Sequence, residues 1–360
     1  MIATYTIQQW LFAEARGRYD IDLAESGVQF QRLGDLTLDP EWELDYSIDQ
    51  GQPELREAVA RLYQRPGSDE DGMVITHGAQ EALYLLYRSL LSAGDHVVTT
   101  SPGWQQSWEV PAHIGCEVSV LPLTPGEPFD AEALARLITP RTKLLVLNSP
   151  GNPSGYRFTE QDWKVLLDVA RAHDLTVVND EEYLLDFAES IVHRYPKALS
   201  VSGLSKVYGL PALRIGWAIG TPDIIAAMVN YKRYTTVSNS WVWERVAADV
   251  LNDRDRHVRR YREFVDGGIG RLTRFADEHA AQVRLVHPAG TPFAWFNLRT
   301  AAASQEIAER LLDEERVLVM PAEVFGSEAG LRISYARPAE VLDEGLNRLG
   351  RLLTGLPTAH

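Results

Sequence analysis

Short apolar runs alternate with amphipathic helical segments between residues 70 and 240. The runs are rich in Val, Leu and Ile, and Gly, Pro or polar residues bound them, which is typical of buried strands. Strands are predicted at 72–76, 95–102, 116–123, 142–150, 175–180, 198–205 and 214–220, with helices at 79–94 and 159–174. Strands separated by helices pair in parallel through crossovers, so the pattern predicts an α/β fold with a doubly wound, mostly parallel sheet.

The pattern changes after residue 260. A long helical stretch leads to mixed apolar and helical segments at 283–298, 304–321 and 330–336, which predicts a smaller α+β domain. We expect a large ligand-binding domain over residues 45–260 and a small domain built from residues 1–44 and 261–360. No Gly or Pro interrupts residues 240–265, so a continuous helix is expected to join the two domains.

Composition argues against several classes of protein. The net charge of −15 would repel nucleic acid, and the densest basic run, Arg254–Arg262, is typical of a solvated helix face. Cys116 is the single cysteine, so an intrachain disulfide and a cysteine metal cluster are excluded, and we expect no metal. No apolar run has membrane-spanning length and no signal-peptide pattern is present, so we expect a cytoplasmic protein without a membrane partner.

Polar side chains follow the predicted strand ends, where ligands bind in sheets of this kind. Gly78, Ala79 and Gln80 begin the helix after the first strand, and the free N–H groups and dipole of a helix start favour a phosphate. Trp104 and Trp108 follow the second strand and offer a face to a flat ligand; Trp104, nearer the strand, is favoured. Each of these features also occurs without any ligand.

The next two strands lead to an amide and a carboxylate. Asn152 lies in the irregular turn N-S-P-G-N-P-S-G, where its amide can donate to a ligand oxygen, although these are also ordinary turn residues. Asp180 ends an apolar run, and Tyr183 follows. A carboxylate at the end of a buried strand needs a cation or several donors, and a protonated heterocyclic nitrogen would serve.

Lys206 directly follows the strand at 198–205 and is one of five lysines among 35 Lys and Arg residues. Partial desolvation and nearby cations at such a position expose a nucleophilic amine. Ser205 adds a hydroxyl, and Arg214, eight residues after the lysine, adds a planar fork suited to phosphate. By itself, a buried lysine is more often ion-paired than catalytic.

Together, these side chains are the groups needed to hold pyridoxal 5′-phosphate. The helix start, the serine and the arginine suit its phosphate, and the tryptophan suits its ring face. The asparagine and the tyrosine suit the phenolic oxygen, and the aspartate suits the ring nitrogen. The lysine would form a Schiff base with the aldehyde.

The chain resembles the fold-type-I pyridoxal-phosphate enzymes, specifically the class I and II aminotransferases related to aspartate aminotransferase, over residues 20–350. N-S-P-G-N-P-S-G is similar to the family's Asn-Pro-(Thr/Ser)-Gly box, D-E-E-Y to its Asp-Glu-x-Tyr box, and L-S-K-V-Y-G-L-P-A-L-R-I-G-W to its Ser-Lys…Gly-x-Arg-x-Gly signature. The spacings from Asn152 to Asp180 and from Lys206 to Arg214 are also similar. The resemblance implies an aspartate aminotransferase-like large domain and catalysis by Lys206, Asp180 and Tyr183.

The resemblance implies roles for three further positions of this chain. Tyr46 corresponds to a tyrosine that reaches the cofactor phosphate of the neighbouring subunit, which implies a homodimer with shared active sites. Arg332, in G-L-R-I-S-Y-A-R-P, is the candidate for binding the substrate α-carboxylate. Gly27 lies where the family has a glycine over the substrate entrance.

One position departs from the family. Gly203 stands where the family has a serine or threonine that binds the phosphate. Ser202 is adjacent but need not point the same way. We expect backbone N–H groups, Thr76 or Tyr46 to compensate.

The resemblance implies transamination of an L-amino acid most directly. Residues 10–28 and 76–85 are also similar to capreomycidine synthase-like members of the family, which act on a β-hydroxylated arginine, eliminate water and close a ring in antibiotic pathways. A cyclase or lyase is therefore the alternative, and decarboxylation and oxidation stay open. A cofactor-sensing transcription regulator is disfavoured, because the resemblance starts near residue 20 and leaves no room for a DNA-binding module.

The alternatives require different pocket residues. A guanidino substrate needs acidic groups, for which Glu25, Asp35 and Asp49 are candidates, although each is also explained as a surface charge. A dicarboxylic substrate would need a second arginine, for which Arg233 is the candidate.

Overall fold

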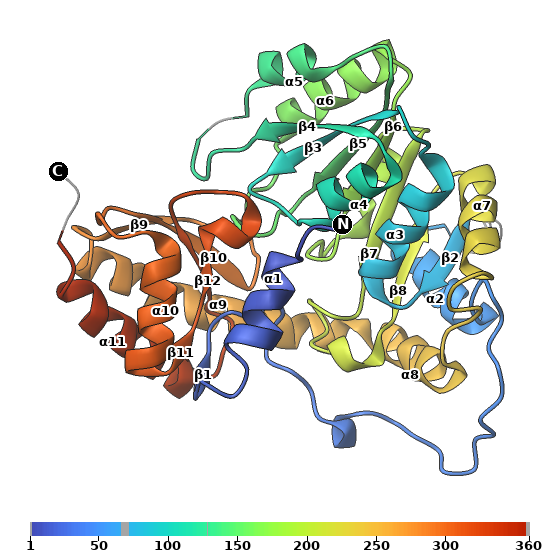
Figure 1. The fold of residues 1–360 in the computed structure, drawn as a ribbon. Helices are drawn as coiled ribbons and strands as arrows, with labels where there is room; N and C mark the ends of the chain where they lie inside the picture. The colour runs from blue at the N-terminus through green and yellow to red at the C-terminus, as the bar shows by residue number, and fades with distance from the viewer. Residues whose placement is uncertain (1, 66–71, 128, 358–360) are drawn as a thin grey trace.

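The computed structural model describes residues 2–65, 72–127 and 129–357, and the chain forms two lobes side by side (Figure 1). The strands of these ranges are β1 (Ile21–Asp22), β2 (Met73–Thr76), β3 (His96–Ser101), β4 (Glu117–Pro122), β5 (Thr142–Asn148), β6 (Thr176–Asp180), β7 (Ala198–Gly203), β8 (Gly216–Ile219), β9 (Val283–Val286), β10 (Phe293–Leu298), β11 (Val317–Leu318), β12 (Met320–Pro321) and β13 (Leu331–Ser334). Among the helices of the same ranges, none is both long and apolar enough to cross a membrane.

The helices include several short turns. The α-helices are α1 (Thr6–Gln8), α2 (Pro53–Leu62), α3 (Gly78–Leu90), α4 (Gln106–Ile114), α5 (Ala131–Leu137), α6 (Glu160–Ala172), α7 (Pro222–Lys232), α8 (Trp241–Asn252), α9 (Arg254–Glu278), α10 (Ser304–Glu315) and α11 (Ala339–Thr354). A π-helical segment, η1 (Gln9–Glu14), continues α1, and the 3₁₀ turns are η2 (Leu33–Asp35), η3 (Phe187–Glu189), η4 (Ile191–His193), η5 (Pro211–Leu213) and η6 (Ala322–Phe325).

The larger lobe is built on a seven-stranded sheet, in the described ranges, with the order β2-β8-β7-β6-β5-β3-β4. Strands β3 to β7 pair in parallel, which confirms the predicted mostly parallel sheet. Strand β8 runs antiparallel to both its neighbours, because the short connection from β7 contains no crossover helix. Strand β8 begins at Gly216, so the expectation that Arg214 lies on this strand is wrong.

Helices cover both faces of this sheet. In β5, Leu144 and Val146 pack into a cluster with α3 and α7, whereas Leu145 and Leu147 pack into a cluster with α6. Alternate side chains of a strand point to opposite faces, so an unbroken apolar run such as this one belongs in a sheet covered on both sides. The open edge formed by the carboxyl ends of the strands is therefore the place for a ligand.

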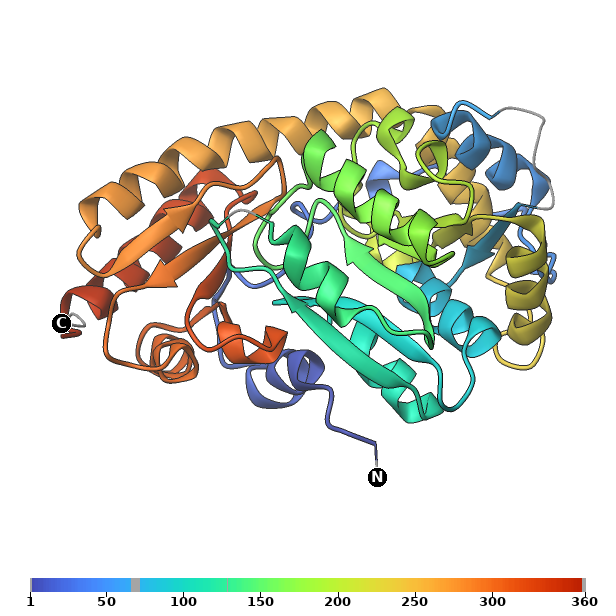
Figure 2. The same cartoon turned by 90° about the horizontal axis from the view of Figure 1, so that it is seen from above.

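The smaller lobe contains an antiparallel sheet of order β12-β13-β10-β9, and the long helix α9 runs along both lobes (Figure 2). Helix α9 is the helix that was expected to join the two lobes, but it does not extend back over residues 240–253. Helix α8 ends at Asn252 and α9 begins at Arg254, because Asp253 between them leaves the helical conformation with φ −102° and ψ 31°.

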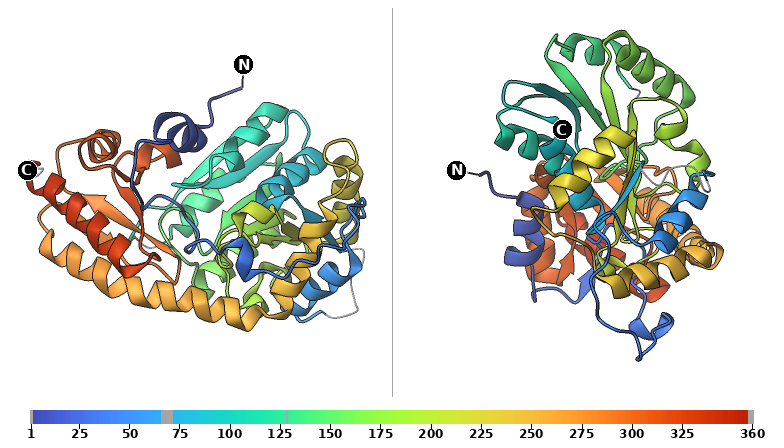
Figure 3. Two further views of the ribbon diagram at one scale, coloured as in Figure 1. Left: turned by 90° about the horizontal axis from the view of Figure 1, so that it is seen from below. Right: turned by 90° about the vertical axis from the view of Figure 1, so that its right-hand side faces the viewer.

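The N-terminal segment packs on the smaller lobe and reaches toward the larger one. Strand β1 pairs in parallel with β11, and the indole Nε1 of Trp10 donates to the carbonyl of Val319 at 2.9 Å. The following loop projects from the body of the chain around η2 (Figures 1 and 3) and then returns to the larger lobe, where Trp42 packs edge-on against Trp241 of α8. The domain boundaries proposed from the sequence remain a prediction.

Candidate active site

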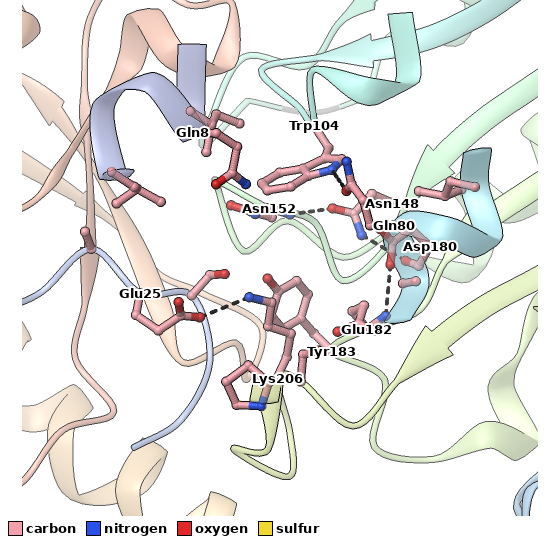
Figure 4. Close-up of a pocket in the computed structure, with 18 of the residues that line it drawn as sticks. Gln8, Glu25, Gln80, Trp104, Asn148, Asn152, Asp180, Glu182, Tyr183 and Lys206 are labelled. Atoms are coloured by element: carbon pink, nitrogen blue, oxygen red, sulfur yellow. Dashed lines mark hydrogen bonds and ion pairs between the residues drawn. The ribbon is translucent and has the colours of Figure 1, made fainter. Parts of the chain in front are cut away.

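A cavity of about 590 Å³ lies between the carboxyl ends of the sheet strands and the N-terminal segment (Figure 4). Its lining includes most of the side chains that the sequence singled out: Ala79, Gln80, Trp104, Asn152, Asp180, Tyr183, Ser205, Lys206, Arg214 and Arg332. Residues separated by more than 250 positions in the chain therefore meet at one place.

Lys206 follows β7 and points across the cavity to the N-terminal segment. Its Nζ lies 3.0 Å from Oε1 of Glu25 (Figure 4). The backbone N–H of Gly27 donates to the same carboxylate oxygen at 2.9 Å. Burial disfavours the charge on Glu25, but the charge and hydrogen bond of Lys206 outweigh burial and lower the pKa of Glu25 to about 2. The amine is thus held by a carboxylate at neutral pH.

Asp180 ends β6 and contributes a buried carboxyl group to the cavity. Burial raises the pKa of Asp180 to about 6, although the backbone N–H of Glu182, 3.1 Å from Oδ1, lowers it. Asn148 holds the backbone here by donating to the carbonyl of Asp180 at 2.8 Å. At pH 7 the group is still largely ionised, so it can pair with a cationic ring nitrogen.

Arg214 and the start of α3 form one cationic corner. Arg214 adopts a left-handed backbone conformation at the end of η5, with Nη1 3.5 Å from Oγ of Ser205 and Nη2 donating to the carbonyl of His77 at 3.3 Å. Gly78 has a φ of +74°, and a Cβ there would lie 2.5 Å from Nη2 of Arg214. Glycine is therefore required for this close approach, and the corner offers cationic and N–H donors that suit a phosphate.

Gly203 has no room for the hydroxyl side chain that the family carries. A Cβ there would lie 2.7 Å from Oε1 of Glu182 and 2.9 Å from the carbonyl oxygen of Ile215. The departure thus has a steric cause, and the carboxyl group of Glu182 stands in the space.

Of the two side chains expected to compensate for Gly203, Thr76 bonds elsewhere, and the role of Tyr46 at the phosphate of a neighbouring subunit stays a prediction. The hydroxyl of Thr76 donates to the carbonyl of Gly78 at 3.0 Å, and Ser202 donates to the carbonyl of Glu181 at 3.1 Å. Tyr46 is 84 % exposed, and its backbone bridges to Ser240. None of these three side chains is among the described residues that line the cavity.

Trp104 and Tyr183 bring aromatic groups to the cavity. The indole Nε1 of Trp104 donates to Oε1 of Gln80 at 2.8 Å, which sets the orientation of the ring; Trp108 is absent from the described lining. Tyr183 packs edge-on against Phe293, with ring centroids 5.1 Å apart, and burial raises the pKa of its phenol. Its hydroxyl is therefore neutral at physiological pH and can donate a hydrogen bond.

Arg332, from β13, is a buried cation between two aromatic rings. Its guanidinium lies 5.2 Å from the Phe293 centroid and 5.0 Å from the Phe325 centroid. Nη1 donates to Oδ1 of Asn152 at 2.7 Å, and Nη2 donates to the carbonyl of Ala24. Nε has no hydrogen-bond partner among the described residues. Burial lowers the pKa of Arg332 to about 10, so the group remains a cation that an incoming carboxylate could satisfy.

Two glycines predicted as site residues lie behind the wall of the cavity. Gly78 backs the cationic corner described above. A Cβ on Gly27 would lie 3.1 Å from the carbonyl of Ser205 and 3.4 Å from Cα of Lys206. Gly27 therefore allows the N-terminal segment to pack closely over the lysine.

Of the acidic and basic candidates for substrate recognition, one lines the cavity and the others lie outside its described lining. Glu25 lines the cavity, whereas Asp35 caps η2 and Asp49 pairs with Arg233 at 2.6 Å. Of these four residues, Glu25 alone belongs to the described lining. The arginines among the described lining residues are Arg214, in the cationic corner, and Arg332, the candidate for the α-carboxylate. The described lining therefore supplies no further arginine for a second substrate carboxylate.

The sequence interpretation missed two parts of the site. One is the N-terminal wall, to which α1 and η1 contribute Ile7, Gln8, Leu11 and Phe12. The other is Glu182, which lines the cavity next to Asp180. The doubled acid of D-E-E-Y was a usable signal for Glu182, whereas no local pattern indicates that the N-terminal residues fold back over the strand ends.

The chain is similar in sequence to known proteins over most of its length. Residues 37–349 match the aminotransferase class I and II family. The chain is 31 % identical to a probable aspartate/prephenate aminotransferase of Thermus aquaticus, covering 86 % of this chain and 83 % of the relative. It is also 31 % identical to capreomycidine synthase of Streptomyces vinaceus, covering 94 % of this chain and 91 % of the relative.

Solved structures are similar over the whole chain. A PLP-dependent aminotransferase from Streptococcus suis superposes with a TM-score of 0.92 at 26 % identity, covering 100 % of both chains. A PLP-dependent cyclase, OrfR, superposes with a TM-score of 0.88 at 28 % identity, covering 98 % of this chain and 97 % of the other.

Proposed function

The chain belongs to the aminotransferase class I and II family, a family of PLP-dependent enzymes, and we propose that its cavity binds pyridoxal 5′-phosphate and catalyses transamination of an L-amino acid. The donor set supports this proposal. The cationic corner of Arg214, Ser205 and the α3 start suits the phosphate, and buried Asp180 suits the ring nitrogen. Trp104 suits the ring face, and Asn152 and Tyr183 suit the phenolic oxygen.

The side chains around the cavity would divide the chemistry between them. When bound, the cofactor supplies an electron sink for charge that develops at the substrate Cα. Lys206 would bind the cofactor aldehyde and then, once released, carry the Cα proton. Arg332 would orient the substrate through its carboxylate, because a planar fork pairs with a carboxylate through two parallel hydrogen bonds.

The observation that carries this proposal is the convergence of Lys206, Asp180 and Arg332 on one cavity. Holoenzyme incubated with a panel of amino acids and no oxo acid tests it. A transaminase converts the cofactor to its pyridoxamine form and releases one equivalent of oxo acid. Retention of the lysine-bound form throughout the panel, with no oxo acid, would contradict transamination.

A cyclase or lyase is the second candidate, and Glu25 favours it. This carboxylate stands 3.0 Å from Lys206 and can pair with a cationic substrate side chain, as a hydroxylated arginine would present. The similarity to capreomycidine synthase and to the cyclase supports the same direction, and it suggests a specialised-metabolite pathway. In the panel experiment, turnover of arginine or its hydroxylated forms with the lysine-bound cofactor regenerated would select this reaction.

We also propose that two copies of the chain form the active unit. The loop before α2 lies at the edge of the chain (Figure 3). Its side chains Leu44 and Tyr46 are 88 % and 84 % exposed. Exposed apolar groups on an extended arm suit a protein interface, and Tyr46 would reach the cofactor phosphate of the partner. Sedimentation as a fully active monomer would contradict this role.

The cytoplasm is the compartment that we propose for this enzyme. Its sole cysteine, Cys116, is buried, and a chain that forms no intrachain disulfide suits a reducing environment. Fractionation of cells that express the tagged chain tests this assignment.

A further inference from the structure

Glu181 and Glu182 are adjacent buried glutamates with opposite environments. Glu181 accepts hydrogen bonds from Asn179, from the backbone of Ile191 and from Ser200. Glu182 is 6 % exposed, and neither carboxyl oxygen has a hydrogen-bond partner among the described residues. A buried carboxyl group without a partner is costly, so an unpaired one that lines a cavity indicates a ligand.

The Glu182 carboxyl group lies beside the cationic corner. Its Oε1 is 2.7 Å from the position that a Cβ on Gly203 would take. Gly203 pairs with Gly216 across β7 and β8, and a Cβ on Gly216 would lie 2.6 Å from the backbone nitrogen of Ala79 at the start of α3. The paired glycines face the same side of the sheet, so one pair of residues without side chains lies against both the carboxyl group and the first N–H groups of α3.

We propose that the carboxyl group of Glu182, in its protonated form, donates a hydrogen bond to the cofactor phosphate and replaces the hydroxyl that Gly203 cannot supply. The inference rests on the proposed function, because it assigns the phosphate to this corner. A phosphate offers acceptors alone, so a carboxyl group beside it must carry a proton or repel it.

The surrounding charges place the proton on Glu182. Burial and the charge of Asp180 raise the pKa of Glu182 to about 8, whereas Lys206 and Arg214 lower it and Glu25 raises it. Asp180, with a pKa of about 6, releases its proton first. Two neighbouring carboxyl groups with separated pKa values take different roles, so at pH 7 Asp180 is the anion and Glu182 the donor.

The test uses apoenzyme and two probes that form no bond with Lys206. The probes are pyridoxamine 5′-phosphate and pyridoxamine, which share the ring and the amine and differ in the phosphate. Binding is measured by calorimetry between pH 6.5 and pH 9 for the wild type, E182Q and E182M. The glutamine keeps an N–H donor and never ionises, whereas the methionine has a similar length and no donor.

Loss of the donor should weaken binding of the phosphorylated probe roughly ten- to hundredfold at pH 7 in E182M, while binding of pyridoxamine stays within about twofold. Between pH 7 and pH 9, Glu182 of the wild type should lose its proton. The affinity for the phosphorylated probe should therefore fall about tenfold more than the affinity for pyridoxamine over this range. In E182Q the two affinities should change by the same factor. Thermal melting of each apoprotein checks folding, and the E182Q profile decides the matter if E182M does not fold.

Two results would overturn the inference alone. Equal losses for both probes in E182M, or an unchanged pH profile in E182Q, would mean that Glu182 does not contact the phosphate, even though the cofactor binds. Wild-type apoenzyme that binds neither probe would instead remove the proposed function, and the inference with it.

Discussion

The two walls of the cavity are built in different ways. The strand-end wall carries Asp180, Lys206 and the cationic corner at the ends of neighbouring sheet strands. The N-terminal wall carries Gln8, Glu25 and apolar side chains from a segment whose ladder with the rest of the chain is the two-residue pairing of β1 with β11. A continuous ladder of backbone hydrogen bonds positions the first wall. The second wall is positioned by that short pairing, by single backbone hydrogen bonds such as the one from Val28 N–H to the carbonyl of Lys206 at 3.1 Å, and by side-chain contacts.

Arg337 is prominent among those contacts. It is 7 % exposed and donates to the carbonyls of Asp22, Glu25 and Gly27. Arg332 adds a bond to the carbonyl of Ala24. The motifs of the cofactor side are therefore local in sequence, whereas the loop on the substrate side is held in part by two buried arginines from distant positions in the chain. Substitutions on the two sides should therefore affect cofactor chemistry and substrate binding separately.

The largest effect is expected for K206A, which removes the amine from the strand-end wall. Activity should fall by roughly four orders of magnitude or more, since both covalent attachment and proton transfer are lost. The visible absorbance of the lysine-bound cofactor should disappear, and borohydride reduction should leave no cofactor on the protein. A variant that retains a reducible linkage would show that the lysine is misassigned.

The next largest effect is expected for R332L, on the substrate side. Loss of a buried carboxylate partner should lower kcat/KM by about two to three orders of magnitude, with a larger effect on substrate binding than on cofactor binding. R332K is the matched control, because it keeps the charge without the fork and should recover part of the loss. Equal activity in R332L and the wild type would place the carboxylate elsewhere.

A smaller and selective effect is expected for E25Q. It should lower kcat/KM about tenfold for substrates with a cationic side chain and less for neutral ones, because the paired charge is lost. D49N removes an acid outside the cavity, where a surface ion pair contributes at most about 1 kcal/mol to stability, so its kinetics should match the wild type. Equal changes in both variants would argue against a role for Glu25 in specificity.

The smallest effect concerns stability against pH. Because the folded-state pKa of Glu182, about 8, exceeds the ordinary value of 4.5, the native state keeps a proton that the unfolded state releases. The wild-type apoprotein should thus lose stability as the pH rises from the ordinary pKa of 4.5 to the folded-state pKa of about 8. E182Q should lose about 1 kcal/mol less between pH 6 and pH 7 in denaturant unfolding, below the limit of about 1.4 kcal/mol per proton and pH unit. Parallel profiles would mean that Glu182 is ionised in the native state.

The comparison explains which parts of the site could be predicted. Asp180 and Lys206 each follow an apolar run, so their place at the sheet edge follows from the alternation of strands and helices. Glu25 looked equivalent to Asp35 and Asp49 in sequence, because an exposed acid and a site acid have the same local context. The antiparallel direction of β8 and the interruption between α8 and α9 at Asp253 also depend on packing that no local pattern encodes.

The sequence by itself determined the α/β architecture, the order of the strand-end groups and the family, because these follow from periodicity and from motifs that span few residues. The tertiary structure decided which acid faces the lysine, why Gly203 cannot carry a side chain, and that Glu182 stands in its place. Those facts depend on distances between segments far apart in the chain. These distances are set only when the N-terminal segment folds over the sheet and β8 pairs with β7 and packs against the start of α3.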